Sequence, residues 1–205
     1  NGVPSETYLE AKRDNSRVVQ NIRFGYDYEL SEKLTLALTV SGYENSYKMI
    51  EEKYLSELDE VNFDDDYYTT EDNYWKNAQM GVSASYRFKE TKIDFISDYL
   101  QYSNNQPVYY SISINEPTGT EKLNLQTTKN SPFEIFANSI DLETNWDEKI
   151  TFNSGVKHII NSYQNKSNFF ENSVANESFS TDSQLDENIS AIYSQVQSDL
   201  SENIK

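Results

Sequence analysis

Strict alternation of apolar and polar residues is the feature that most constrains this chain. The even-numbered positions from Ile22 to Leu30 are apolar or aromatic, and the odd-numbered positions between them are polar, charged or glycine. Residues 34–41 continue the pattern, with Leu or Val alternating with Thr, Ala or Ser. Successive side chains of a β-strand point to opposite faces, so this period of two predicts two strands with one apolar face each. Only residues 31–33 separate them, which predicts a tight antiparallel hairpin.

The same unit returns along the chain. Alternating segments flank short turns near residues 89–91 and 147–149, and a further strand from Ile189 leads to another turn near 201–203. Between these hairpins lie polar segments, which we expect to be long loops: residues 48–74, 103–131 and 166–187. The sequence therefore predicts one all-β, antiparallel domain over residues 1–205, with short turns at one end and long loops at the other.

Alternation alone fits two environments, because the period is the same in both. In a soluble, secreted β-sandwich or adhesin-like binding module, the apolar face points inward. In a transmembrane β-barrel, apolar side chains face lipid and polar ones face the lumen. Asymmetric connections and strands longer than the ~9 to 11 residues needed to cross a bilayer favour the barrel. So do aromatic residues beside the short turns, which are predicted to lie at the membrane interface: Tyr26, Tyr28, Tyr86, Phe88, Trp146 and Phe152.

Composition excludes several other classes of protein. The chain has 34 Asp and Glu against 17 Lys and Arg, a net charge of −17, so nucleic acid is not an expected partner. With no Cys and a single histidine, His158, neither a thiolate zinc site nor a His-based catalytic relay can be assembled within it. No catalytic residues and no cofactor are predicted, and we expect the protein not to be an enzyme.

Two groups of residues are candidates for binding. Asp64, Asp65 and Asp66 lie in an acidic stretch and are a weak candidate for supplying oxygen ligands to Ca²⁺; a solvated, self-repelling surface loop is the simpler explanation. Six aromatic residues near the predicted loops could contact a carbohydrate or peptide, or could form a second interfacial girdle instead: Tyr67, Tyr68, Tyr74, Trp75, Tyr109 and Tyr110.

Several strand segments resemble a known family. Residues 25–36, with the sequence GYDYELSEKLTL, resemble a hairpin of TonB-dependent-receptor-like barrels, and the closer resemblance is to the outer-membrane β-barrel family common in Bacteroidota. Residues 98–100 (DYL), 154–157 (SGVK) and 186–193 (DENISAIY) resemble further strands of that family, in the same order.

The resemblance implies a barrel of about 22 strands with an N-terminal plug, in the outer membrane of a Gram-negative bacterium. This chain accounts for seven or eight strands and shows no plug. We therefore expect a part of a larger barrel, which serves substrate uptake or belongs to a larger envelope complex. Its expected partners are outer-membrane lipid and, in a complex, a surface lipoprotein or another envelope protein.

Overall fold

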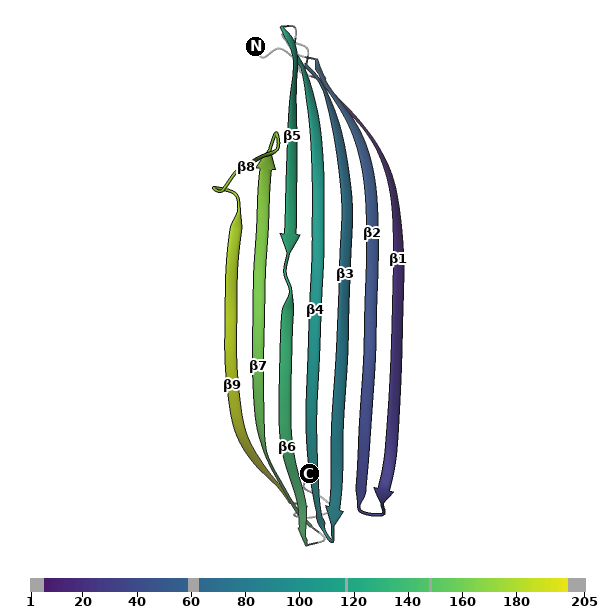
Figure 1. Ribbon diagram of the computed structural model, residues 1–205, viewed down its shortest axis with the longest axis vertical. Coiled ribbons are helices and arrows are strands. Elements are labelled where there is room, and N and C mark those ends of the chain that lie inside the picture. Colours follow the sequence, from purple (N-terminus) through teal and green to yellow (C-terminus); the bar gives the residue numbers. More distant parts are fainter. Residues whose placement is uncertain (1–5, 59–62, 117, 148, 199–205) are drawn as a thin grey trace.

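The structure, a computed structural model, describes residues 6–58, 63–116, 118–147 and 149–198 as a single antiparallel β-sheet. The strands run side by side along the long axis of the molecule (Figure 1). Their bounds are β1 Glu6–Ser31, β2 Leu34–Leu58, β3 Phe63–Phe88, β4 Thr91–Glu116, β5 Gly119–Asn130, β6 Phe133–Asp147, β7 Ile150–Glu171, β8 Val174–Ala175 and β9 Thr181–Ser198. The described residues include no helix that could cross a membrane.

Strands β1 to β4 pair along nearly their whole length. Each has 25 or 26 residues, and the β2–β3 register continues without a shift from Leu34 opposite Tyr86 to Glu57 opposite Phe63. The predicted turns near 31–33 and 89–91 are confirmed, since only residues 32–33 and 89–90 separate the strands there. The turn near 147–149 also joins two strands, and the one near 201–203 lies outside the described residues.

Strands β5 and β6 lie end to end along strand β4. β5 pairs with the upper half of β4 and β6 with its lower half, and two residues interrupt the line between them. Pro132 has no N–H to donate to a ladder, which explains a break at this point. Ser131 compensates, because its N–H donates to Asn104 Oδ1 at 2.6 Å and its hydroxyl donates to Asn165 Oδ1 at 2.7 Å.

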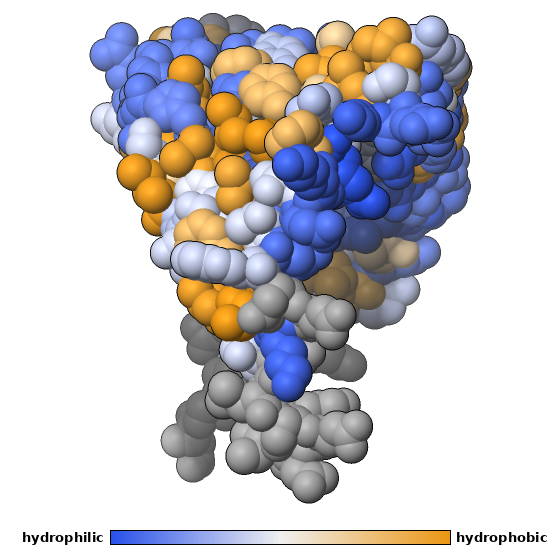
Figure 2. Space-filling model, turned by 90° about the horizontal axis from the view of Figure 1, so that it is seen from below, coloured by the Kyte–Doolittle hydropathy of each residue, from blue (hydrophilic) through white to orange (hydrophobic). Residues whose placement is uncertain are grey.

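The two faces of the sheet have opposite character at the end with the short turns. We call the face that carries Ile22 and Leu38 the outer face, and the face that carries Arg23 and Thr39 the inner face; the strand registers extend both across the sheet. Many large apolar side chains on the outer face are exposed, from 37% for Val82 to 85% for Ile192. Figure 2, viewed from this end, shows such residues gathered in patches on the surface. Apolar residues turned to the surroundings are the signature of a lipid-facing barrel wall.

The inner face is the more enclosed one, because the sheet curls toward it. Buried side chains on β2 and β3 all belong to this face: Asn45, Met49, Glu51, Thr69 and Asn73. Only one of these is apolar. The described residues therefore lack the apolar interior that a soluble β-sandwich requires, and no second sheet packs on this one.

The predicted long loops are wrong. Residues 48–58 and 63–74 continue β2 and β3, residues 103–116 and 119–130 belong to β4 and β5, and most of 166–187 lies in β7 and β9. Crossing a bilayer takes about 9 to 11 residues of a tilted strand, so β1 to β4 extend well beyond it. Both faces of those extensions meet water, so neither face needs to be apolar. The extensions therefore lack the alternation of apolar and polar residues that identified the membrane-spanning parts as strands.

The sheet has two open edges. Within the described ranges β1 pairs only with β2 and β9 pairs only with β7, and these strands lie at opposite sides in Figure 1. An unpaired strand edge cannot be satisfied in hydrocarbon, where no water is available to the backbone N–H and C=O groups. The sheet is therefore a section of a larger barrel, whose further strands pair with β1 and β9.

The assignment of the faces predicts how two neighbouring positions of β2 respond to a charge. Leu38→Arg places a guanidinium on the outer face and should destabilise the folded barrel by roughly 2–4 kcal/mol near the bilayer midplane. Ala37→Arg points into the lumen opposite Asp27 and should have a much smaller effect. Urea unfolding of the full protein in lipid vesicles measures both. Equal destabilisation by the two variants would show that the faces are assigned incorrectly.

Candidate functional site

The inner face carries charge across the membrane-spanning part of the sheet. Six carboxylates and four cationic side chains point inward there: Arg23, Asp27, Glu29, Arg87, Lys92, Asp94, Asp98, Asp141, Glu143 and Lys157. Lys92 pairs with Asp94 at 2.8 Å. Charged groups at this depth face an aqueous cavity or one another in membrane proteins. The inner face is therefore the wall of a wet interior.

Two glycines allow polar side chains to lie flat on this wall. A Cβ added to Gly81 would come within 2.5 Å of Asp98 Oδ1 and 2.8 Å of Thr39 Oγ1. At Gly155, an added Cβ would meet the Tyr193 ring at 2.5 Å and Asp141 Oδ1 at 2.7 Å. Close approach of this kind is a usual reason for glycine within a strand. Because these glycines have no side chain, neighbouring side chains can lie across the inner face at these two positions.

Above the membrane, the inner wall is organised around a buried carboxylate. Arg13 on β1 donates two hydrogen bonds to Glu51 Oε1, from Nε at 2.9 Å and from Nη2 at 2.6 Å, and Lys53 Nζ lies 2.7 Å from Oε2. The hydrogen bonds from Lys53 and Arg13 lower the pKa of Glu51 below its usual range. The contact between Glu51 and Arg13 raises the pKa of Arg13. Glu51 is thus held ionised between two cations and ties β1 to β2.

Next to this network, amide and aromatic side chains line the inner wall. Arg17 Nε donates to Asn45 Oδ1 at 2.9 Å, and the register places Trp75 opposite Asn45. One step closer to the membrane, a row across β2, β3, β4, β6 and β7 has Asn77 on β3 and an aromatic residue on each other strand: Tyr43, Tyr102, Phe133 and Tyr163. The rings of Tyr102 and Phe133 stack with centroids 4.8 Å apart. We call Trp75 and these four residues the aromatic wall.

The six aromatic residues predicted as ligand contacts do not form one surface. The alternation of β3 and β4 places Tyr67, Trp75 and Tyr110 on the inner face, and Tyr68, Tyr74 and Tyr109 on the outer face. Tyr67 donates to Asp65 Oδ2 at 3.1 Å, and burial and this contact raise its pKa. Any ligand inside the barrel could therefore reach only half of the set.

The predicted calcium site is not formed. Asp64, Asp65 and Asp66 are consecutive in a strand, so Asp65 points to the inner face and its neighbours point to the outer face. Asp64 Oδ1 accepts a hydrogen bond from Tyr54, and no group of three acidic or histidine side chains in the described residues could hold a metal. A loop could have turned the carboxylates together, whereas the pleat of a strand separates them.

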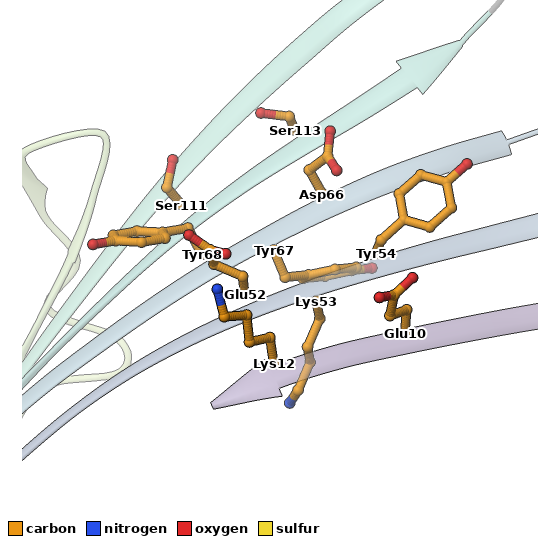
Figure 3. A pocket seen from close by; sticks show the side chains of 10 residues that line it. All are labelled: Glu10, Lys12, Glu52, Lys53, Tyr54, Asp66, Tyr67, Tyr68, Ser111 and Ser113. Carbon is orange, nitrogen blue, oxygen red and sulfur yellow. The ribbon is translucent and has the colours of Figure 1, made fainter. Parts of the chain in front are cut away.

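A shallow pocket of about 400 Å³ lies on the outer face, where the sheet extends beyond the membrane. Figure 3 shows Lys12, Glu52 and Tyr68 side by side, on the adjacent strands β1, β2 and β3. Tyr54 and Asp66 lie beside them along β2 and β3. Both signs of charge and two phenols are available here to a polar partner outside the barrel.

The residues predicted for the membrane interface lie near the short turns, on the outer face. Tyr26, Tyr28, Tyr86 and Phe88 are 55%, 48%, 42% and 51% exposed, and Trp146 is 81% exposed. Phe152 lies opposite Thr144 on the same face. This placement fits an aromatic girdle for the residues beside the turns, whereas Tyr26 lies opposite Leu38, farther along the strands. Contact of the girdle with lipid headgroups stays a prediction.

Sequence reasoning missed the Glu51 network and most of the aromatic wall. Glu51 and Lys53 lie in the predicted loop 48–74, whereas the residues of the aromatic wall lie one to five positions outside the predicted loops. Of the aromatic wall, only Trp75 was singled out. The inner face of β2 could have been predicted by extending the strand beyond residue 41 and taking every second residue. The odd-numbered positions then share one face: Asn45, Tyr47, Met49, Glu51 and Lys53. Polar residues on both faces concealed that continuation.

The Glu51 network predicts a local dependence on pH. Because the folded-state pKa of Glu51 is lowered, its ion pairs stabilise the sheet above the ordinary pKa of about 4.3 and are lost as the pH falls through the folded value. At pH 7, Glu51→Gln should speed amide hydrogen exchange of residues 10–16 and 48–54, and the difference from the wild type should shrink as the pH falls below the ordinary pKa of a glutamate. Glu52→Gln, on the outer face, is the matched control. A constant difference at all pH values would contradict the network.

Comparison with known proteins places the chain in a family. The sequence model described as "Outer membrane protein beta-barrel family" matches residues 87–205. A search of curated proteins finds no match. Among solved structures, the chain is similar to the ferric yersiniabactin uptake receptor FyuA from Yersinia pestis, with 11% identity and a TM-score of 0.28, over 95% of this chain and 44% of that one. The siderophore receptor PirA from Pseudomonas aeruginosa has 10% identity and a TM-score of 0.17, over 80% and 52% of the two chains.

Both structural similarities are too weak to establish a shared fold, and the chain spans about half the length of each receptor. The family match carries the assignment, because it covers more than half of the chain and includes β4 to β9. The apolar outer face and the charged inner face agree with it. The chain belongs to the outer membrane protein β-barrel family and is part of a β-barrel in the outer membrane of a Gram-negative bacterium.

Proposed function

We propose that the whole barrel takes up a solute across the outer membrane and that this chain forms part of the wall of its passage. The observation that carries the proposal is the charged inner face, which extends through the membrane-spanning part of the sheet. A wall that only anchored the protein in lipid would have no need of ten charged side chains on its inner face. The resemblance of several strand segments to TonB-dependent receptors supports the same role.

We further propose that the aromatic wall contacts the solute. Aromatic faces stack on sugar rings and on apolar side chains, and neighbouring amides such as Asn45 and Asn104 offer hydrogen bonds. Inside the membrane, the inner wall of this section has more carboxylates than cations, which disfavours anionic solutes. A neutral or cationic oligosaccharide or peptide fits these surfaces best.

A role in an envelope complex is the second candidate, supported by the outer pocket beside Lys12 and Glu52. That pocket lies on the outside of the barrel, beyond the membrane, where a passing solute would not meet it. A surface lipoprotein or another envelope protein would bind there. Uptake and complex formation are compatible, since they use opposite faces of the same strands.

An uptake assay tests the proposal directly. Cells lacking the protein are compared with cells complemented by the wild type, using a defined mixture of labelled oligosaccharides, peptides and iron chelates as probes. We expect at least one class to be depleted from the medium more slowly without the protein and to be restored by complementation. If all classes are taken up equally while the cell surface is altered, uptake is excluded and the structural role is supported.

Neighbouring aromatic residues with opposite orientation provide matched variants for the same assay. Trp75→Ala removes a ring of the aromatic wall, and Tyr110→Ala removes a ring of the same inner face farther from the membrane. Tyr74→Ala and Tyr109→Ala remove rings from the outer face at the same two heights. Loss of one stacking contact of about 1 kcal/mol should raise the half-saturating concentration of the solute roughly fivefold in the inner-face variants only. Equal effects in both pairs would show that the aromatic wall does not contact the solute.

A further inference from the structure

The outer face is not uniformly apolar within the membrane-spanning part. One row of residues crosses all the long strands in register, and its first three members are apolar: Tyr26, Leu38 and Val82 on β1, β2 and β3. The same row then continues with four polar residues on β4, β6, β7 and β9, which we call the polar row: Ser97, Asn138, His158 and Ser190. The character of the wall therefore changes between β3 and β4.

Apolar residues lie on both sides of the polar row. The row nearer the short turns is apolar on all four strands: Phe95, Ile140, Val156 and Ile192. On the other side, the row is apolar on β4, β6 and β7, with Tyr99, Phe136 and Ile160, and polar on β9, with Asn188. On β4, β6 and β7 the polar row thus has apolar neighbours on both sides, and the first wholly polar row lies farther on, at Gln101 and Glu134.

The polar row is only partly satisfied by the protein itself. His158 Nδ1 and Ser190 Oγ lie 2.9 Å apart and share a hydrogen bond. Across the described ranges, no side-chain partner is found for Asn138 or Ser97. Acyl chains offer neither donors nor acceptors, so an amide and an imidazole facing lipid would be costly. Polar side chains on membrane-facing surfaces instead favour association with another protein segment.

We propose that the outer face over β4, β6, β7 and β9 is an interface with a second copy of this protein, joined by the polar row. Every member of the row both donates and accepts hydrogen bonds, and none is charged when His158 is neutral. A two-fold contact brings the same patch of both copies together, so the patch must be complementary to itself. A row of uncharged groups, each able to donate and to accept a hydrogen bond, meets this requirement. The flanking apolar rows pack against their counterparts, and the wholly apolar face over β1 to β3 stays in lipid.

Cysteine cross-linking in native outer membranes tests the interface, because this chain contains no Cys. Ser97→Cys, Asn138→Cys, His158→Cys and Ser190→Cys are introduced singly into the full protein and oxidised with copper phenanthroline. We expect at least one of them to give a disulfide-linked species of twice the mass on non-reducing gels. Leu38→Cys, in the same row on β2, is the control and should stay monomeric. The wild type shows whether Cys elsewhere in the full protein contributes.

Three outcomes would overturn the proposal: no cross-linking from any of the four positions, equal cross-linking from Leu38→Cys, or a product whose mass corresponds to a different protein. A second measurement does not depend on disulfide geometry. Asn138→Leu combined with His158→Leu makes the face fully apolar, so the barrel should still insert and fold. Its dimer fraction in mild detergent, measured by light scattering, should fall on the order of tenfold, since two polar contacts per copy are lost. An unchanged dimer fraction would contradict a role for the polar row.

Discussion

Backbone hydrogen bonding in hydrocarbon is the constraint on which the rest of this structure depends. Lipid cannot accept or donate hydrogen bonds, so each N–H and C=O group within the bilayer must find a partner in a neighbouring strand. The uninterrupted β2–β3 register, from Leu34 to Glu57, meets that requirement over its whole length. Where Pro132 interrupts the line of β5 and β6, side chains of Asn104 and Asn165 bond to Ser131.

The same pairing that satisfies the backbone also separates the side chains into two environments. Lipid selects apolar residues on the outer face, and water in the lumen permits charged ones on the inner face. Each strand therefore carries a lipid-facing side and a water-facing side at once. The polar row departs from this division on the outer face, and the proposed partner would supply the hydrogen bonds that hydrocarbon cannot.

Beyond the membrane, the strands continue but the forces on them change. Both faces are wet, so pairing is maintained by the ladder itself and by cross-strand contacts such as those of Glu51 with Arg13 and Lys53. The outward extension of β1 to β4 lifts the aromatic wall and the outer pocket above the bilayer on opposite sides of one sheet. The proposed solute site and the proposed partner site thus share no residues.

The alternation around Ile22–Leu30 and Leu34–Ser41 was sufficient to predict long hairpins, the short turns and the lipid-facing side. It failed for residues 48–74 and 103–131, since strands with water on both faces have no apolar period to detect. The calcium prediction at Asp64, Asp65 and Asp66 failed with it, because it assumed a loop. The six aromatic residues were recognised as surface features, but whether a ring points inward or outward depends on a strand register that was not foreseen.

By itself, the sequence determined the class of this protein and its environment: the period of two is a local property, and lipid and water act on each strand separately. The tertiary structure alone decided which residues meet. Glu51 lies between Arg13 and Lys53, and Ser97, Asn138, His158 and Ser190 form one row, only because strands distant in the chain pair in a particular register. That register follows from the turns and from backbone pairing along the whole sheet, which no single segment encodes.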